Sequence, residues 1–241
     1  MNYKLKIQYD GTNYSGWQIQ DNAVTVQQKI TDAIKTITKQ NINLIGSGRT
    51  DTGVHALGQV GNFISNEELD IYRFKYSLNS ILPEDISVIS IEETEEKFHS
   101  RFDAKKRSYI YLFSKIKSPF INKYSYFLNE KFDINFMNEI SKSFLGKHNF
   151  TSFAKKKTET KNKNCNIYDI HWKEFRDKIS FYIEADRFLH GMVRTIVGTL
   201  INVHKDKWDI EQIKKIFKSE DRSTAGEAVP AKGLFLYKVK Y

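Results

Sequence analysis

The spacing of apolar residues along this chain changes repeatedly between the two-residue period of a strand and the longer period of a helix. Residues 3–9 alternate apolar and polar side chains, which predicts a half-buried strand. Residues 26–37 carry apolar side chains at helical intervals. Thr25, just before them, forms a capping-box pair with Gln28, so this segment is predicted to be a helix. Further strands are expected at 42–45, 59–64, 86–92 and 98–103, and a further helix is expected to start from the capping-box pair Ser65 and Glu68 and to stop before Pro83.

The second part of the chain repeats this pattern. Its expected strands are 107–113, 167–173, 179–184 and 234–240, and its expected helices are one ending at Gly146 and two at 190–203 and 209–218. Such alternation predicts an α+β fold built from two halves, residues 1–104 and 105–241. No composition-biased linker separates the halves near residues 104–107, so we expect a broad interface and a cleft between them.

A surplus of positive charge narrows the classes of partner. The chain has 38 lysines and arginines against 29 aspartates and glutamates, which gives a formal net charge of +9. This surplus favours a polyanionic partner, which can be a nucleic acid, a phosphorylated metabolite or an anionic membrane. Charge alone does not choose among the three.

The cysteine content and the apolar stretches indicate a compartment. Cys165 is the only cysteine, which excludes an intramolecular disulfide and a multi-cysteine metal site, and we expect a buried thiol. The N-terminus alternates polar and apolar residues instead of presenting a signal-peptide core. The most apolar stretch, 192–203, is short and is interrupted by Arg194. We therefore expect a cytoplasmic protein.

The densest group of chemically active residues lies in the loop GSGRTDTG at 46–53. Its glycines allow a backbone to approach a ligand closely, and Asp51 stands among them with one arginine and two threonines. The loop is neither a Walker motif nor a dinucleotide fingerprint, and a carboxylate would repel a phosphate. Two interpretations remain open here: a simple turn, with Asp51 bonding its own backbone, or a site where Asp51 is a nucleophile or base.

His55 follows this loop and has three possible roles. It could be a general base beside Asp51, a metal ligand or a structural hydrogen-bonding residue. The six histidines of the chain show no paired helical spacing and no HExxH motif, so a zinc site is not expected. We interpret His55 as structural and predict no metal.

Arg194 is unusual because it lies at the edge of an apolar helix face between two glycines, Gly191 and Gly198. Glycines inside a helix cost about 1 kcal/mol each relative to alanine. They would allow another segment to approach and the guanidinium to reach a carboxylate. The alternative is an arginine that extends along the rim of the helix to solvent.

Aromatic residues alternate on the strand at 107–113, where Tyr109, Tyr111 and Phe113 share one face. Alternating aromatics on a strand are usually core residues. Basic residues precede them at 105–107, however, and an aromatic ring beside positive charge can stack on a nucleobase.

Considered together, these segments resemble the tRNA pseudouridine synthases of the TruA type. The matching strings occur in the family's order: YDGTNYSGWQIQ, GSGRTDTGVHA, LNSILPEDI, FHSRFDAKKRSYIY, GKHNFTSF, FLHGMVRTIVGTL and PAKGLFLYKVKY. The resemblance implies two ferredoxin-like halves with mostly antiparallel sheets, joined across a central catalytic cleft, and a homodimer. It also implies conversion of uridine to pseudouridine at positions 38, 39 and 40 of the tRNA anticodon stem-loop, without metal or cofactor.

The resemblance also assigns roles to residues. The family's catalytic aspartate falls on Asp51 and its base-contacting tyrosine on Tyr109. The arginine that pairs with the aspartate falls on Arg194, and the arginine associated with flipping the target nucleotide falls on Arg49. Departures are mild: Thr52 stands where many members have alanine, and Asp186-Arg187 replace a smaller polar pair. The resemblance leaves open whether the aspartate attacks C1′, removes a ribose proton or adds to the base.

Three other functions compete with this one. They are a catalytically silent RNA-binding protein of the same fold, an enzyme of phosphorylated metabolites that uses the 46–53 loop, and a synthase with other target uridines. A pseudouridine assay, a gel shift with tRNA and mapping of the modified positions discriminate among them. The lysine-rich stretch 154–163 is a candidate RNA contact or a solvated loop.

Overall fold

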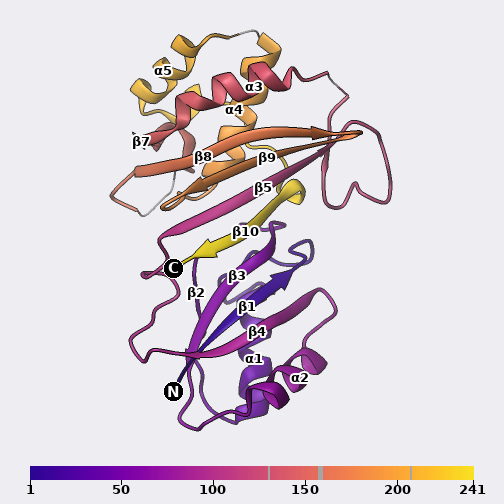
Figure 1. Ribbon diagram of the computed structural model, residues 1–241, viewed down its shortest axis with the longest axis vertical. Coiled ribbons are helices and arrows are strands. Elements are labelled where there is room, and N and C mark those ends of the chain that lie inside the picture. The colour runs from indigo at the N-terminus through magenta and orange to yellow at the C-terminus, as the bar shows by residue number, and fades with distance from the viewer. Residues whose placement is uncertain (130, 157–159, 207) are drawn as a thin grey trace. The chain divides into compact units, whose positions relative to one another are not determined.

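The computed structural model describes residues 1–129, 131–156, 160–206 and 208–241 and has the predicted α+β character (Figure 1). Two compact units form, one from Met1–Lys105 with Phe235–Tyr241 and one from Lys106–Leu234. This division differs from the expected halves 1–104 and 105–241 by one residue at Lys105 and in the assignment of the last seven residues, Phe235–Tyr241. They belong with the first unit because their strand pairs with a strand of that unit.

The first unit has the chain order and strand order of a ferredoxin-like fold. Strand β1 pairs antiparallel with both β3 and β4, and β2 pairs antiparallel with β3. Strand β10 pairs in parallel with β3, through Phe235 opposite His55 and Leu236 opposite Ala56. Its elements are β1 (Asn2–Tyr9), α1 (Val26–Thr38), β2 (Ile45–Gly46), β3 (His55–Ile64), α2 (Ile71–Ile81), β4 (Ile86–Thr94) and β10 (Leu234–Lys240).

The predicted patterns explain β1 and α1. The apolar face of β1, from Tyr3 to Tyr9, is buried, with exposed fractions of 5% or less. Helix α1 begins after Thr25, whose side chain accepts a hydrogen bond from the Gln28 backbone N–H at 3.3 Å. The Gln28 side chain donates to Asp32 instead of returning to the cap, so only half of the capping box forms.

Three sequence predictions for this unit are wrong in detail. Helix α2 begins after Asp70, whose carboxylate caps the Arg73 N–H, while Ser65 makes a local turn with Glu67. Residues 98–103 form turns instead of a strand, because Asp103 bonds back to His99 through both its side chain and its backbone N–H. The strand expected at 42–45 is reduced to β2.

The second unit is also built from a sheet and helices. The strand order is β5-β9-β8-β7, with antiparallel pairing throughout, and β6 pairs in parallel with β5. In Figure 1, α3, α4 and α5 gather on one side of these strands. Its elements are β5 (Lys106–Ser114), β6 (Tyr126–Phe127), α3 (Ile134–Ser141), β7 (Gly146–Asn149), β8 (Asn164–Phe175), β9 (Lys178–Ala185), α4 (Met192–Asp206) and α5 (Ile210–Ser219), with short 3-10 turns at Lys142–Phe144, Thr151–Phe153, Arg222–Thr224 and Ala231–Gly233.

Details of the second unit correct one expectation and confirm another. Gly146 does not cap α3, which ends at Ser141; Gly146 instead begins β7 with a φ of +89°. In the lysine-rich stretch 154–163, residues 157–159 lie outside the described part of the chain. Cys165 is buried as predicted, and burial raises the pKa of its thiol to about 12. Within the described residues, no helix is long and apolar enough to cross a membrane.

Candidate active site

The Asp51 loop, residues 46–53, lies between β2 and β3 and is held at its first turn by buried polar contacts. The Ser47 backbone N–H donates to the Val60 carbonyl at 2.7 Å, and the Ser47 hydroxyl donates to Gln59 Oε1 at 2.7 Å. Gln59 Nε2 in turn donates to the Gly48 carbonyl at 2.9 Å. Because Ser47 and Gln59 are buried, these bonds fix the backbone that leads to Asp51.

Asp51 itself opens a tight turn. The Val54 N–H donates to the Asp51 carbonyl at 3.1 Å, and Gly53, the third residue of this turn, has a φ of +75°. A positive φ at that position is typical of a type II turn and favours glycine. The half-buried Asp51 carboxylate is thus presented from a defined backbone. The residues from Asp51 to Val54 therefore form a turn, and this turn is compatible with both interpretations of the loop, a simple turn and a site that uses Asp51.

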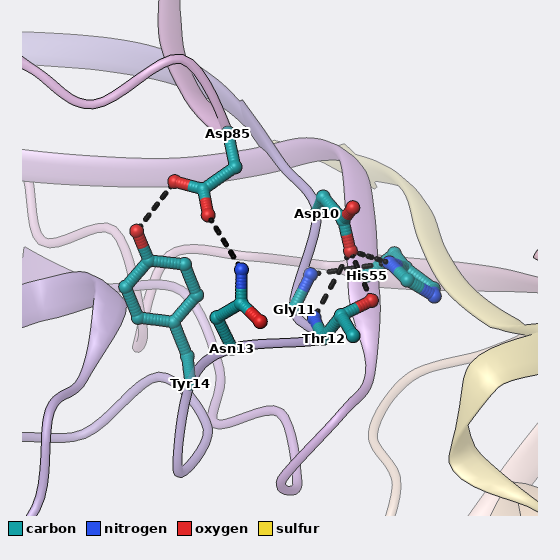
Figure 2. A network of polar contacts seen from close by, with 7 residues as sticks. All are labelled: Asp10, Gly11, Thr12, Asn13, Tyr14, His55 and Asp85. Carbon is teal, nitrogen blue, oxygen red and sulfur yellow. Dashed lines mark hydrogen bonds and ion pairs between the residues drawn. The ribbon is translucent and has the colours of Figure 1, made fainter. Parts of the chain in front are cut away.

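His55 is a structural hydrogen-bonding residue, as predicted. Its exposed fraction is 1%, and its ring stacks on Phe235 with a centroid distance of 4.7 Å. The Gly11 N–H donates to His55 Nδ1 at 3.1 Å, and Asp10 Oδ1 lies 3.0 Å from the same nitrogen (Figure 2). Among the described residues, no group of three or more His, Cys, Asp or Glu side chains is placed to hold a metal ion.

Tyr109 lies on β5 and differs from its neighbours on the same face. Tyr111 and Phe113 are core residues, and the Tyr111 hydroxyl donates to the Pro230 carbonyl at 2.7 Å. Burial raises the pKa of Tyr111 far above its ordinary value, although the charge of Arg194 opposes the shift. Tyr109 keeps an exposed fraction of 8%, and its ring meets Phe188 edge to face at 5.1 Å. The core interpretation therefore fits Tyr111 and Phe113 best.

Arg194 lies on α4 and is bound to the segment 226–229, which crosses that helix. Arg194 Nε donates to the Val229 carbonyl at 2.7 Å, and the Val229 N–H donates to the Arg194 carbonyl at 3.2 Å. Gly198 allows this approach, because a Cβ there would lie 1.7 Å from the Glu227 carbonyl oxygen. The prediction that a glycine beside Arg194 admits another segment is confirmed at Gly198.

The same prediction is wrong for Gly191. Among the described residues other than its chain neighbours, no atom lies within 4 Å of a Cβ placed on Gly191, so close approach of another segment does not require glycine there. Its φ of +74° instead explains the glycine, because residues with a side chain rarely adopt that backbone conformation. Gly191 turns the chain immediately before α4 begins at Met192.

The four candidate residues divide between the two units. Arg49, which is exposed, and Asp51 share one loop of the first unit. Tyr109 and Arg194 belong to the second unit, on β5 and α4. Each unit therefore carries part of the candidate set.

Sequence reasoning missed the residues that support the Asp51 loop from the neighbouring segment. The Trp17 N–H donates to the Thr50 carbonyl at 3.1 Å, and the Tyr9 hydroxyl pairs with Thr50 Oγ1 at 2.7 Å. A signal for Tyr9 was present, since it is the last buried residue of the alternating strand and borders a glycine-containing loop.

Comparison with known proteins identifies the class. The family model described as tRNA pseudouridine synthase matches residues 6–103 and 140–241, and the chain belongs to this family, whose members are isomerases. Arg49, Asp51 and Arg194 lie inside the matched ranges, whereas Tyr109 lies between them.

Particular relatives match over the full length. The chain is 43% identical to tRNA pseudouridine synthase A 2 of Clostridium perfringens, covering 100% of this chain and 99% of the relative. It is 40% identical to tRNA pseudouridine synthase A of Thermoanaerobacter sp. and 43% identical to that of Clostridium acetobutylicum, with the same coverage. Among solved structures, an archaeal box H/ACA sRNP Nop10-Cbf5 complex aligns with a TM-score of 0.41 and 10% identity, over 84% of this chain and 43% of that chain. These values are too low to bear on fold or function.

Proposed function

We propose that this protein isomerises uridine to pseudouridine at positions 38, 39 and 40 in the anticodon stem-loop of tRNA, with Asp51 as the catalytic carboxylate. The observation that carries the proposal is the half-buried Asp51 at the start of a braced turn, inside a family match that covers both units. A loop backbone that is held by hydrogen bonds suits a carboxylate that must be positioned against one reacting atom.

The chemistry needs a carboxylate more than it needs a cofactor. Uridine and pseudouridine are isomers, so no group and no electrons have to be supplied from outside. The C1′–N1 bond breaks, the uracil rotates, a C1′–C5 bond forms, and the proton on C5 is lost as N1 is protonated. Asp51 serves as nucleophile or base in this sequence, by attack on C1′, by removal of a ribose proton or by addition to the ring.

The other candidate residues would handle the base and the charge. A target inside a stem must leave the stack at a cost of a few kcal/mol, and Arg49 would assist this step. Tyr109 would stack on the base once it is out. Arg194 would keep Asp51 ionised and oriented, which is the role that the resemblance of the sequence assigns to it.

The partner, assembly and compartment complete the proposal. The net charge of +9 suits a folded RNA, because lysines and arginines that contact phosphates release counterions. A homodimer is proposed from the resemblance of the sequence to its family, and a cytoplasmic location is proposed from the single cysteine.

The experiment that tests the function is a position-resolved pseudouridine assay. Unmodified tRNA transcripts carrying uridine at one of positions 38, 39 or 40 are incubated with purified protein, and modified positions are mapped by carbodiimide labelling and primer extension. We expect pseudouridine at each of the three positions. Modification only elsewhere would assign different target uridines, and tight tRNA binding without modification would assign a silent RNA-binding protein.

Arg194→Lys is expected to reduce the single-turnover rate by about 100-fold or more, with little change in tRNA affinity. Lysine keeps the charge but has a single nitrogen, which cannot bond Val229 and hold a carboxylate in a fixed planar geometry at the same time. Rates are measured with excess enzyme, and affinity is measured by filter binding. A rate within twofold of the unsubstituted protein would reject the pairing role.

A further inference from the structure

The Asp51 loop is gripped on both sides of the aspartate by one neighbouring segment, residues 9–17. This segment starts at the last residue of β1 and forms the first part of the connection to α1. It contacts Thr50, the residue before Asp51, and Gly53, two residues after it. Both contacts are long-range in sequence, so neither follows from the local turn.

Thr50 is held through both its side chain and its backbone. The Tyr9 hydroxyl pairs with Thr50 Oγ1 at 2.7 Å, and both residues are buried. The Trp17 N–H donates to the Thr50 carbonyl at 3.1 Å, and the Tyr9 and Trp17 rings pack at 6.0 Å. Gly16 permits this fit, since a Cβ there would lie 2.5 Å from the Thr50 carbonyl oxygen.

The second contact lies on the other side of Asp51. The Gly53 N–H donates to the Tyr14 carbonyl at 3.4 Å, and the Gly11 N–H donates to His55 Nδ1 at 3.1 Å. The aspartate therefore sits between two points that the same segment holds. A displacement of the segment would move both points together.

The segment is itself anchored to Asp85, just before β4 (Figure 2). The Tyr14 hydroxyl donates to Asp85 Oδ1 at 2.5 Å, and the Asp10 N–H donates to the Asp85 carbonyl at 2.9 Å. Burial and the hydrogen bond to Asp85 raise the pKa of Tyr14 well above its ordinary value. The support of the Asp51 loop thus extends into the strands of the unit.

We propose that Tyr9, acting through the Thr50 hydroxyl, is a positioning residue that fixes the Asp51 carboxylate for the isomerisation. This inference rests on the proposed function of Asp51. The Tyr9 ring supplies packing against Trp17, and its hydroxyl pairs with the Thr50 hydroxyl. Loss of that bond would leave the fold in place and let the residue beside Asp51 shift.

The test is a double-mutant cycle with Tyr9→Phe, Thr50→Val and the combined variant. Each single substitution is expected to lower the single-turnover rate about tenfold, with tRNA affinity unchanged. The combined variant is expected to be no slower than the slower single variant, because one bond is lost in each case. Thr50→Ser, which keeps the hydroxyl, is expected to restore most of the rate.

Tyr3→Phe is the matched control. Tyr3 lies on the same strand and is equally buried, but its hydroxyl accepts from the Leu69 N–H at 2.8 Å, away from the loop. A purely structural role for Tyr9 predicts the same small effect from both tyrosine variants. Equal single-turnover rates for Tyr9→Phe and Tyr3→Phe, or additive effects of Tyr9→Phe and Thr50→Val, would overturn the positioning role.

A second measurement separates this inference from the proposed function. Amide hydrogen exchange of a peptide covering residues 46–56 is expected to quicken in Tyr9→Phe and to stay unchanged in Tyr3→Phe. If the unsubstituted protein forms no pseudouridine, the proposed function fails whatever the exchange shows. If it is active and the exchange of this peptide is unchanged in Tyr9→Phe, the positioning role alone fails.

Discussion

Asp51→Asn is expected to lower pseudouridine formation by about 10⁴-fold or more while leaving tRNA affinity within twofold, the scale of loss seen when other enzymes lose a nucleophile or base. Asparagine has nearly the same shape, and the bond from the Val54 N–H goes to the Asp51 backbone carbonyl, so the turn persists. What disappears is the negative charge and the basic oxygen. None of the three routes open to Asp51 can proceed with a neutral amide.

The measurement is the single-turnover rate on an unmodified tRNA, with affinity determined in parallel. Asp70→Asn serves as a control for the loss of one negative charge from the same unit, because asparagine caps a helix as well as aspartate does and α2 should persist. We expect the control to react at the rate of the unsubstituted protein. Normal turnover by Asp51→Asn would show that Asp51 is not the catalytic carboxylate.

Gly198→Ala is expected to destabilise the protein by about 3 kcal/mol or more, which places it among the largest effects of single substitutions. The added Cβ would lie 1.7 Å from the Glu227 carbonyl oxygen, a contact that only a backbone shift can relieve. The Gly226 N–H donates to Thr199 Oγ1 at 2.9 Å, so the shift would also strain that bond. Since the same segment holds the Arg194 guanidinium, activity should fall with stability.

Thermal unfolding measures the first effect, and a loss of this size corresponds to a decrease of about 6–12 °C in the midpoint for a chain of this length. Gly191→Ala is the matched comparison, because it also adds a methyl group next to α4, and in the described part of the chain that group would meet no atom within 4 Å beyond its chain neighbours. Its cost comes from the positive φ alone and should be the smaller of the two. Equal losses for both variants would contradict the close contact at Gly198.

Regular elements could be predicted wherever one side-chain period persists over several residues. The alternation at 3–9 and 234–240 predicted β1 and β10 closely, because a half-buried strand leaves that pattern in the sequence. The prediction failed at 98–103, where the Asp103 carboxylate captures the His99 N–H and the chain turns. Short polar side chains can bond backbone groups that would otherwise pair with a neighbouring strand, and the spacing of apolar residues contains no sign of such bonds.

The candidate site could be predicted only where its residues lie close together in the sequence. The Asp51 loop concentrates glycines, charges and hydroxyls within eight residues, so it stands out in the sequence. The pairing of Tyr9 with Thr50 joins residues 41 positions apart and depends on the register between β1 and β3. Likewise, one alternating pattern covers Tyr109 and Tyr111. What distinguishes them is the contact of the Tyr109 ring with Phe188 and the hydrogen bond of the Tyr111 hydroxyl to Pro230.

The return of the chain to the first unit has a consequence for biosynthesis. Strand β10 completes the edge of β3, and the Tyr241 hydroxyl donates to the Ser100 carbonyl at 2.8 Å. These residues leave the ribosome after the whole of Lys106–Leu234. The first unit is therefore translated first but completed last. Until β10 has been synthesised, the backbone of β3 at His55 and Ala56 lacks the strand with which it pairs in the folded protein.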